Sequence, residues 1–387
     1  MLRVSVVALG AVLTSGCTFY TACPNGTQAG SNTNTGSAGA PSTAGSGNNA
    51  GSGNNTSGGI TGVTPTDPWV DATGDLEGRA VGYGAVTYVS SKPDEDVLIA
   101  GLSEYGLWGS VDGGGSWTAM GTGKGSDKIT NRPSSIQYDP DDASGFWEGG
   151  SYGPGVLSTS DDGKTFTALG MIGGVDSVSV DFTDPKRKTL AASGHEKSRN
   201  LEVSSDGGDT WQDVGPSLPD GTNSCSFPVV IDSQTLLVTC SQFGVTESGI
   251  FRSTDLGQTW VKVNSTPAWN PALVTAKGAI YWPNETGGLL KSTDQGQTWT
   301  QILNSGTGLP AIELPDGSIA AWNGKTVVVS SDEGMSWRVV TSEFPMGAAG
   351  LAYSPFQKAF YAWQLSTNPT IPALSVQKFD FDYSASP

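Results

Sequence analysis

Short apolar runs, separated by polar turns rich in Gly, Asp, Ser and Thr, recur along most of the chain. One stretch shows the pattern clearly, with apolar runs at residues 225–231, 235–240, 249–253 and 260–263. Runs of this length between clusters of turn residues are typical of β-strands. The pattern therefore predicts units of four short strands each.

An eight-residue phrase occurs six times between such runs, and its first copy is Ser110-Val-Asp112-Gly-Gly114-Gly-Ser116-Trp117. In every copy Asp stands five residues before the final aromatic, Gly three before, and Ser or Thr seven before and one before. The copies are 49, 45, 49, 39 and 38 residues apart. Such spacing indicates a radial architecture built from one repeated strand unit. The final aromatic residues are Trp117, Phe166, Trp211, Trp260, Trp299 and Trp337.

The phrase itself predicts a hairpin turn. Its Asp accepts hydrogen bonds from backbone N–H groups further along the turn, and its Gly adopts positive φ without steric cost. The aromatic residue begins the next strand and buries a large apolar surface. The repeated carboxylates are therefore interpreted as structural rather than catalytic; they are Asp112, Asp161, Asp206, Asp255, Asp294 and Asp332.

This phrase is similar to the Asp-box, or BNR repeat, of sialidases, xyloglucan-active hydrolases, sortilin-type receptors and a photosystem II assembly factor. The resemblance covers roughly residues 67–387. It implies an all-β β-propeller with each box on the turn between the third and fourth strands of a blade. Because the box recurs in enzymes, receptors and assembly factors, it says little about activity.

The number of blades follows from length and from the strands that lack a box. About 320 residues at roughly 40 to 50 per blade predict a single seven-bladed propeller, with six blades as the fallback. Residues 348–354, 359–365 and 373–381 supply three strands without a box. Trp69-Val70-Asp71 resembles a fourth strand, so we expect the amino-terminal strand to complete the last blade. Such closure removes an exposed sheet edge.

Composition narrows the function. The chain has 54 Gly and 15% charged residues, which suits a turn-rich all-β protein. A net charge of −17 argues against nucleic-acid binding, and the one dense basic cluster, Lys186-Arg187-Lys188, is interpreted as a solvated turn. A single histidine and no cysteine cluster argue against a zinc or multi-histidine site, so we expect no metal and no cofactor.

The amino terminus has the features of an export signal. Arg3 precedes an apolar run and the segment Leu13-Thr-Ser-Gly-Cys17, which resembles a bacterial lipoprotein signal over residues 1–16 with lipidation at Cys17. Ordinary secretion is the alternative, because Leu13 lies one position further from the cysteine than the usual pattern. Residues 17–66 carry no charge and are rich in Gly, Ser, Asn and Thr, so they predict a disordered tether ahead of the propeller at 67–387.

Two cysteines stand on neighbouring predicted strands. If Asp232-Ser233 forms a two-residue turn, the register places Cys225 directly opposite Cys240, which predicts a disulfide in an exported protein. Cys23 then has no obvious partner, and pairing of Cys17 with Cys23 is the alternative to lipidation.

In propellers, the loops between second and third strands line one face of the central funnel. An aromatic residue or His recurs near the end of almost every predicted second strand, and flat rings with a few polar groups suit a sugar or peptide ligand. The alternative is that these rings plug the tunnel or pack between blades. The candidate ligand-binding residues are Tyr105, Tyr152, Arg132, Arg199, Phe243, Trp282, Trp322 and Trp363.

Catalysis is less well supported. The sialidase Arg-Ile-Pro phrase is missing from the sequence, and too few of its seven Arg remain for a carboxylate-binding triad. A single propeller also cannot form the cleft that xyloglucan hydrolases build between two. A glycosidase acid and base need lie only about 5 to 10 Å apart. The weak catalytic candidates are therefore Glu104, Glu148, Glu196 and Glu285, with His195 as a lone general base.

The leading hypothesis is a monomeric lipoprotein of the bacterial cell envelope whose propeller binds a glycan or protein partner on its funnel face. It would contact the membrane only through the lipid anchor and would bind no nucleic acid. The alternative is an exported glycoside hydrolase, sialidase-like or xyloglucanase-like, that acts on polysaccharide.

Overall fold

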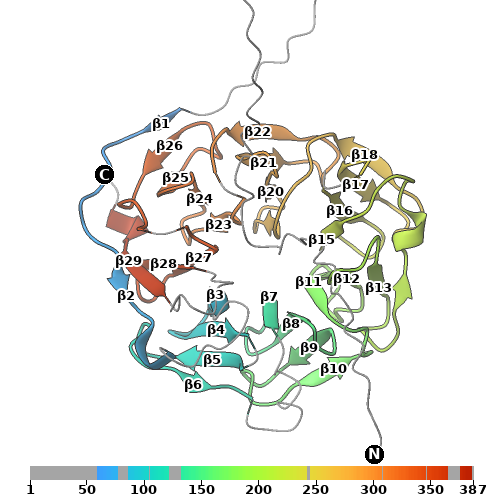
Figure 1. Cartoon of the computed structure of the whole chain (residues 1–387), viewed down its shortest axis with the longest axis horizontal. Helices are drawn as coiled ribbons and strands as arrows, with labels where there is room; N and C mark the ends of the chain where they lie inside the picture. Colours follow the sequence, from blue (N-terminus) through green and yellow to red (C-terminus); the bar gives the residue numbers. More distant parts are fainter. Residues whose placement is uncertain are drawn as a thin grey trace, which may run out of the picture. The chain divides into compact units, whose positions relative to one another are not determined.

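A computed structural model describes residues 59–76, 86–103, 105–121, 132–241, 245–306, 308–345, 347–364 and 375–385. Their strands form seven sheets, which are arranged as the blades of a ring (Figure 1). The expected all-β seven-bladed propeller is confirmed, and the six-bladed fallback is excluded. The predicted signal, Cys17 and nearly all of the predicted tether lie outside the described residues.

Each blade has four antiparallel strands, numbered from the centre of the ring outward except in the last. Blade 1 consists of β3 (Val86–Ser91), β4 (Leu98–Leu102), β5 (Gly106–Ser110) and β6 (Thr118–Ala119). Blade 2 consists of β7 (Arg132–Tyr138), β8 (Phe146–Ser151), β9 (Val156–Thr159) and β10 (Thr167–Leu169). Blade 3 consists of β11 (Val175–Val180), β12 (Leu190–Gly194), β13 (Leu201–Ser204) and β14 (Gln212–Asp213).

Blade 4 consists of β15 (Cys225–Val230), β16 (Leu236–Cys240), β17 (Gly249–Ser253) and β18 (Val261–Asn264). Blade 5 consists of β19 (Leu273–Val274), β20 (Ile280–Pro283), β21 (Leu289–Ser292) and β22 (Thr300–Leu303). Blade 6 consists of β23 (Ile312–Glu313), β24 (Ile319–Trp322), β25 (Val327–Ser330) and β26 (Trp337–Val339). Blade 7 consists of β27 (Gly350–Ser354), β28 (Ala359–Trp363), β29 (Val376–Asp380) and β2 (Val70–Asp71).

The ring is closed by the amino-terminal strand, as the sequence predicts. Strand β2 pairs antiparallel with β29, Val70 lying opposite Lys378. An additional strand, β1 (Ile60–Thr61), pairs in parallel with β26 on the outer edge of blade 6. Blade 7, which has no box, is therefore completed by a segment from the opposite end of the sequence (Figure 1).

The segment 59–76 links three blades. Its β1 lies on blade 6, and the Trp69 ring packs between blades 6 and 7, with centroids 5.1 Å from Phe344 and 5.4 Å from Phe379. After β2, the Asp75 carboxylate accepts a 2.8 Å hydrogen bond from the backbone N–H of Trp117 in blade 1. We call residues 59–76 the strap.

The core lies between the blades, because alternate residues of each strand face opposite neighbours. Strand β16 shows this. Leu236 and Val238 pack in a cluster with blade 3, whereas Leu237 packs in a cluster with blade 5. Both faces of β16 are buried, so the strand reads as a continuous apolar run. Cys225 lies directly opposite Cys240 in the register, and a disulfide joins them with an S–S distance of 2.07 Å.

Every box forms the turn between the third and fourth strands of its blade, as predicted, and the same hydrogen bonds recur in all six. The Asp Oδ1 accepts from the first hydroxyl at 2.7–2.9 Å. It also accepts from a backbone N–H four residues on, at 2.8–2.9 Å. The Asp Oδ2 accepts from the hydroxyl of that same residue at 2.6–2.7 Å. The box Gly has φ between 73° and 98°.

The boxes also connect neighbouring blades. The Trp211 indole donates to the Leu169 carbonyl of blade 2 at 3.1 Å, and the Trp337 indole donates to the Ile302 carbonyl of blade 5 at 3.1 Å. On this side of the ring, which we call the box face, ion pairs add further links. One of them joins Lys92, after the first strand of blade 1, to Asp162 in the box of blade 2 at 2.6 Å.

The basic cluster at residues 186–188 is a turn, but its central side chain is not solvated. Arg187 is only 8% exposed. Its guanidinium donates to Asp139 at 2.7 Å and to Asp141 at 2.6 Å, on the neighbouring blade. The interpretation as a solvated turn is therefore wrong for Arg187. Its neighbours Lys186 and Lys188 are exposed, and nothing in the sequence distinguishes Arg187 from them. Among the described helices, none is long and apolar enough to cross a membrane.

We expect Asp206→Ala to lower the Tm by about 2 to 4 °C, because the third box would lose all the hydrogen bonds that its carboxylate accepts. Asp209→Ala is the matched control, since Asp209 is an exposed carboxylate of the same turn. Differential scanning calorimetry of both variants measures the effect. Equal Tm values would show that the box carboxylate does not stabilise the turn.

The boxes also predict acid sensitivity. Hydrogen bonding, first of all from the Ser116 hydroxyl, lowers the pKa of Asp112 to about 2, and the pKa is lowered in the other five boxes as well. In the unfolded chain these groups have pKa values of about 3.9. Their stabilisation is thus complete above about pH 4 and is lost as the pH falls toward 2. Urea unfolding at pH 5, 4, 3 and 2 should show this loss, and a smaller loss in Asp112→Asn.

Candidate functional site

The loops between second and third strands and the connections between blades lie at the end of the ring opposite the box face. We call this end the loop face. Three successive loops of blades 2 and 3, residues 151–155, 170–174 and 195–200, lie next to one another there. Gly173 N–H donates to the Pro154 carbonyl at 3.2 Å, and His195 N–H donates to the Gly174 carbonyl at 2.9 Å. These three loops bring together several of the residues that the sequence singles out.

A buried His–Asp pair forms the base of this site. His195, at the end of β12, lies 2.5 Å through Nδ1 from Oδ1 of Asp176 on β11. Both side chains are buried, at 6% and 7% exposed. A hydrogen bond on Nδ1 fixes the orientation of an imidazole ring and directs Nε2 away from the partner. Here Nε2 lies 3.8 Å from Glu196 Oε1.

Tyr152 forms the exposed surface of the site. Its ring packs edge-on against His195 with centroids 4.5 Å apart, and its hydroxyl donates to Glu196 Oε1 at 3.1 Å. The Tyr152 side chain is nevertheless 63% exposed. An aromatic ring that is held by two neighbours and still faces solvent loses little entropy when a ligand packs on it. We call Tyr152, Asp176, His195 and Glu196 the His195 cluster.

The backbone around the cluster has unusual conformations. Tyr152 has φ 63° and Glu196 φ 55°, in the left-handed region that residues with a side chain seldom adopt. Strand β11 has a register shift between Val175 and Ser177, so Asp176 occupies a bulge. Bulges redirect side chains and are frequent next to binding and active sites. The bulge accounts for Asp176 meeting His195 instead of pairing in the ladder.

The sequence singles out His195, Glu196 and Tyr152 but not Asp176. The available signal was an acidic residue within Val175-Asp-Ser-Val-Ser-Val180, an otherwise strand-like run in which all six residues prove to be buried. A buried carboxylate requires a partner. The single histidine of the chain was the candidate that could have been paired with it.

Three of the proposed ligand-binding tryptophans do not face a ligand. Trp282, Trp322 and Trp363 are 0%, 4% and 4% exposed and belong to the clusters between blades. The expectation that they line the funnel is corrected in favour of the packing alternative. The physical reason is strand alternation, because a ring near the end of a second strand points sideways into the neighbouring blade.

The remaining candidates differ in accessibility. Tyr105 is exposed, and Glu285 is partly exposed at the loop after β20. Arg199 is occupied within the loop face, since its guanidinium donates to the Pro216 carbonyl at 3.1 Å and to the Leu218 carbonyl. Glu104 and Phe243 lie outside the described residues, and of Arg132 only the backbone is described.

Glu148 is not on the surface. Its side chain is fully buried on β8, and burial raises its pKa to about 8. A carboxyl group that solvent does not reach cannot contact a substrate in this conformation, so Glu148 and Glu196 do not form an accessible acid–base pair. Within the part of the chain that the structure describes, no group of three or more His, Cys, Asp or Glu residues is placed to hold a metal ion.

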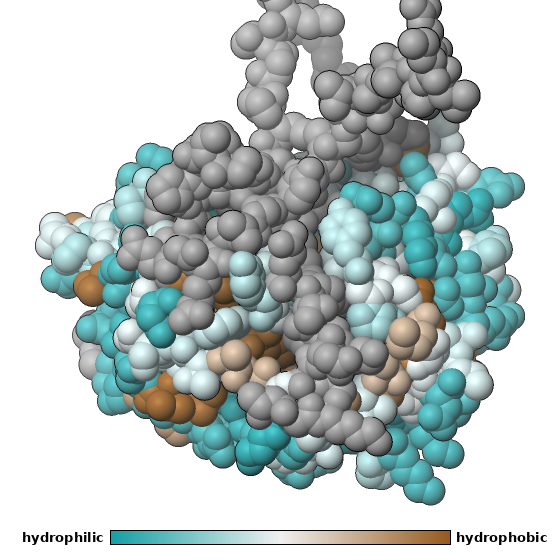
Figure 2. All heavy atoms as spheres, turned by 60° about the horizontal axis from the view of Figure 1, so that its bottom comes forward, coloured by the Kyte–Doolittle hydropathy of each residue, from teal (hydrophilic) through white to brown (hydrophobic). Residues whose placement is uncertain are grey.

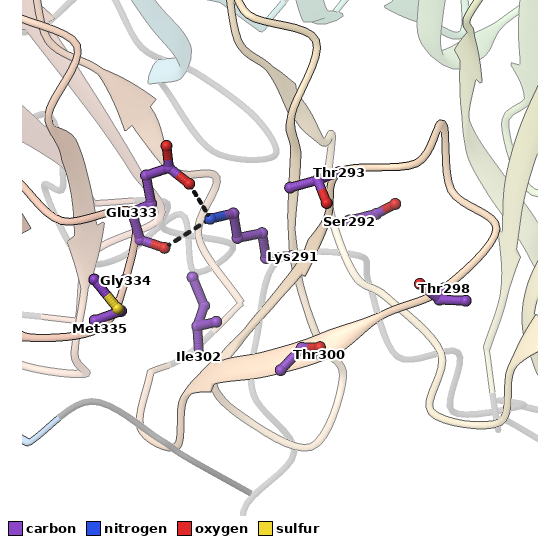
Figure 3. Close-up of a pocket in the computed structure, with 9 residues that line it drawn as sticks. All are labelled: Lys291, Ser292, Thr293, Thr298, Thr300, Ile302, Glu333, Gly334 and Met335. Atoms are coloured by element: carbon purple, nitrogen blue, oxygen red, sulfur yellow. Dashed lines mark hydrogen bonds and ion pairs between the residues drawn. The ribbon is translucent and has the colours of Figure 1, made fainter.

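A separate groove of about 260 Å³ lies between blades 5 and 6 on the box face (Figure 3). Lys291 crosses it and donates to the Glu333 carbonyl at 3.0 Å and to its carboxylate at 2.8 Å. The hydroxyl of Thr298, in the wall of the groove, donates a hydrogen bond to the carboxylate of the box residue Asp294. Because its polar walls take part in scaffold contacts, we place the candidate site on the loop face instead.

No family model and no curated protein sequence matches this chain. Solved structures do match its fold. A GH74 enzyme from Niastella koreensis is similar with a TM-score of 0.53 and 18% identity, over 80% of this chain and 55% of that one. The GH74 xyloglucanase from Xanthomonas campestris gives a TM-score of 0.50 and 18% identity, over 78% and 52%.

A third similar structure is PorZ of Porphyromonas gingivalis, an essential bacterial surface component of the type-IX secretion system. Its TM-score is 0.50 at 14% identity, over 78% of this chain and 48% of that one. This chain spans about half the length of all three proteins. At such identities the likeness shows a shared β-propeller fold, which occurs both in enzymes and in a secretion component.

The His–Asp pair can be tested by a double-mutant cycle. We expect Asp176→Ala and His195→Ala to destabilise the protein non-additively, with a coupling energy of about 1.5 to 3 kcal/mol, because each substitution removes the hydrogen bond between the two buried side chains. Urea unfolding of the wild type, both single variants and the double variant provides the free energies of unfolding. Additivity within about 0.5 kcal/mol would show that the pair does not stabilise the site.

Proposed function

We propose that this protein is an exported cell-envelope lipoprotein, anchored through Cys17, whose propeller binds a glycan or protein partner on the loop face at the His195 cluster. The observation that carries the proposal is Tyr152. Its ring is fixed by His195 and its hydroxyl by Glu196, yet the side chain is 63% exposed. Pre-ordered tyrosines of this kind are typical contact residues for both glycans and proteins.

Several observations support export. The Cys225–Cys240 disulfide is stable in oxidising compartments. The sequence resembles a lipoprotein signal that ends at Cys17 and is followed by an uncharged segment long enough to hold a domain away from a membrane. The fold is shared with a bacterial surface component.

The surface also suits a polar partner. Where described residues are visible in Figure 2, apolar side chains form small groups surrounded by polar ones. Exposed apolar residues stand among polar ones on the loop face too, where Tyr152 is hydrogen-bonded to Glu196, and Lys197 donates to the Ile172 carbonyl next to the exposed Met171. Permanent interfaces bury larger continuous apolar areas. We therefore expect a reversible complex rather than an obligate one, and a propeller that is monomeric by itself.

A glycoside hydrolase is the second candidate. It is favoured by Glu148, whose pKa of about 8 is that of a carboxylic acid kept protonated at neutral pH, as in general acids. Against it stands the complete burial of that side chain. An enzyme of this kind would require the interior of blade 2 to open.

The two candidates are separated by measuring binding and turnover together. The purified full chain is titrated with xyloglucan and a panel of other soluble polysaccharides by affinity electrophoresis, and new reducing ends are assayed in the same mixtures. We expect binding of at least one polysaccharide without release of reducing ends. Release that is lost in Glu148→Gln would favour the hydrolase. Failure of every polysaccharide to bind would restrict the proposal to a protein partner.

Tyr152→Ala should weaken any such binding about tenfold or more, because one well-placed aromatic contact contributes at least about 1.4 kcal/mol. Phe356→Ala is the matched control, since Phe356 is an exposed aromatic residue in the β27–β28 hairpin on the box face. Equal affinities for Tyr152→Ala and wild type would exclude the His195 cluster as the binding site.

A further inference from the structure

Glu148 occupies a position that is apolar in the other box-containing blades. In each of these blades, one residue of the second strand pairs with the first hydroxyl residue of the box, as Phe146 pairs with Thr159 in blade 2. Glu148 stands two residues further along β8. By the same register the equivalent residues are Ala100, Ala192, Val238, Trp282 and Ala321, all buried. Blade 2 alone among them places a carboxyl group there.

The carboxyl group faces the seam between blades 1 and 2. Its register partners, Ile136 and Leu157, pack with Ile99, Leu107 and Phe146 in the cluster that fills this seam. The side chain is 0% exposed, and neither oxygen has a hydrogen-bond partner among the described residues. An unpaired carboxylate is strongly disfavoured in such surroundings, whereas a protonated carboxyl is tolerated.

The other titratable side chains that the structure describes at this seam do not neutralise it. Tyr88 donates to the Ile136 carbonyl at 3.5 Å, and Tyr138 shares a 2.8 Å hydrogen bond with Ser90. Burial raises the pKa of Tyr88 to about 12 and that of Tyr138 further, so both stay neutral between pH 5 and 9. Strands β3, β4, β5 and β9 have no charged residue.

The two ends of the seam are held differently. On the box face, Lys92 is 2% exposed and forms an ion pair of 2.6 Å with Asp162, which fastens blade 1 to blade 2. On the loop face, the Thr87 hydroxyl of blade 1 donates to the Pro133 carbonyl of blade 2 at 2.6 Å, and β8 continues from Glu148 through Ser151 directly to Tyr152. A separation of the blades at this end would break the Thr87–Pro133 hydrogen bond, pivot at the Lys92–Asp162 pair and displace the end of β8 that carries Tyr152.

We propose that Glu148 is a proton-operated latch. When protonated it keeps the seam between blades 1 and 2 closed, and when ionised it favours opening of the seam toward the loop face. The latch itself stands independently of the proposed function. Its consequence for a partner, namely that rising pH displaces Tyr152 and weakens binding, rests on that function.

The expected pH dependence follows from linkage. In the closed seam the Glu148 pKa is about 8, whereas a solvated Glu has a pKa near ~4.3. Between these values only the closed state holds the proton. The equilibrium constant for opening therefore increases about tenfold per pH unit from about pH 5 to pH 8, and levels off above it.

The test is amide hydrogen exchange of the full chain, without any ligand, between pH 5 and pH 9 and corrected for the intrinsic exchange rate. We expect peptides that cover β4, β5, β7 to β9 and residues 151–155 to exchange faster as the pH rises to 8, and peptides of blades 4 and 5 to change much less. Glu148→Gln should remove this dependence. Glu148→Ala, which installs the residue found in blades 1, 3 and 6, provides a second test if the first variant folds poorly.

Glu343→Gln is the control, because Glu343 is exposed and should leave the profile of the wild type unchanged. The latch would be refuted if the seam peptides showed no pH dependence, if Glu148→Gln retained it, or if all blades responded equally. None of these outcomes bears on polysaccharide binding, so the latch and the proposed function can fail separately.

Discussion

The stability of this ring depends on one carboxylate that satisfies several donors within a single turn. In each box the Asp accepts from two hydroxyls and a backbone N–H, which leaves the turn few alternative conformations. A rigid turn sets the register of the third and fourth strands and fixes where the aromatic residue begins. The Trp211 and Trp337 indoles can then reach carbonyls of the preceding blades. Local hydrogen bonding thereby determines how blades are spaced around the ring.

This arrangement separates the two faces of the propeller. The box face holds repeated turns and ion pairs between blades, such as Lys92 with Asp162 and Arg187 with Asp139. The boxes do not lie on the loop face, and there blades 2 and 3 depart from the repeat. They hold a carboxylate, Asp176, at a bulge position that Thr87 and Ser134 occupy in blades 1 and 2, left-handed residues at Tyr152 and Glu196, and nearby the buried Glu148. Departures from a repeat that cost stability are where function is expected.

Much of the fold follows from the sequence because its determinants are short-range. The box turns, the strands of blade 7 and the closing strand at Val70 depend on local patterns and register. Cys225 does lie opposite Cys240, but the predicted two-residue turn at Asp232-Ser233 is wrong: Ile231 bonds to Thr235 across residues 232–234, and a register shift between Ser226 and Val229 restores the alignment. The site depends on the direction in which each side chain points, and the sequence reveals this poorly. Trp282 and Glu148 both lie on second strands, and alternation places both side chains between blades rather than at the surface. Asp176 was missed because a bulge leaves no distinctive residue pattern.

The strap has a consequence for the order in which the molecule assembles. Thr73 and Val376 are hydrogen-bonded across 303 positions of sequence. Such a distant pairing pays a large loop-closure entropy and forms late. Blades 1 to 6 can fold while the chain is being synthesised. The outer edge of blade 7 stays unpaired until β29 has been made and β2 pairs with it. If β2 were bound elsewhere before that point, the nascent chain would be left with an unpaired strand edge on blade 7 that is prone to aggregation.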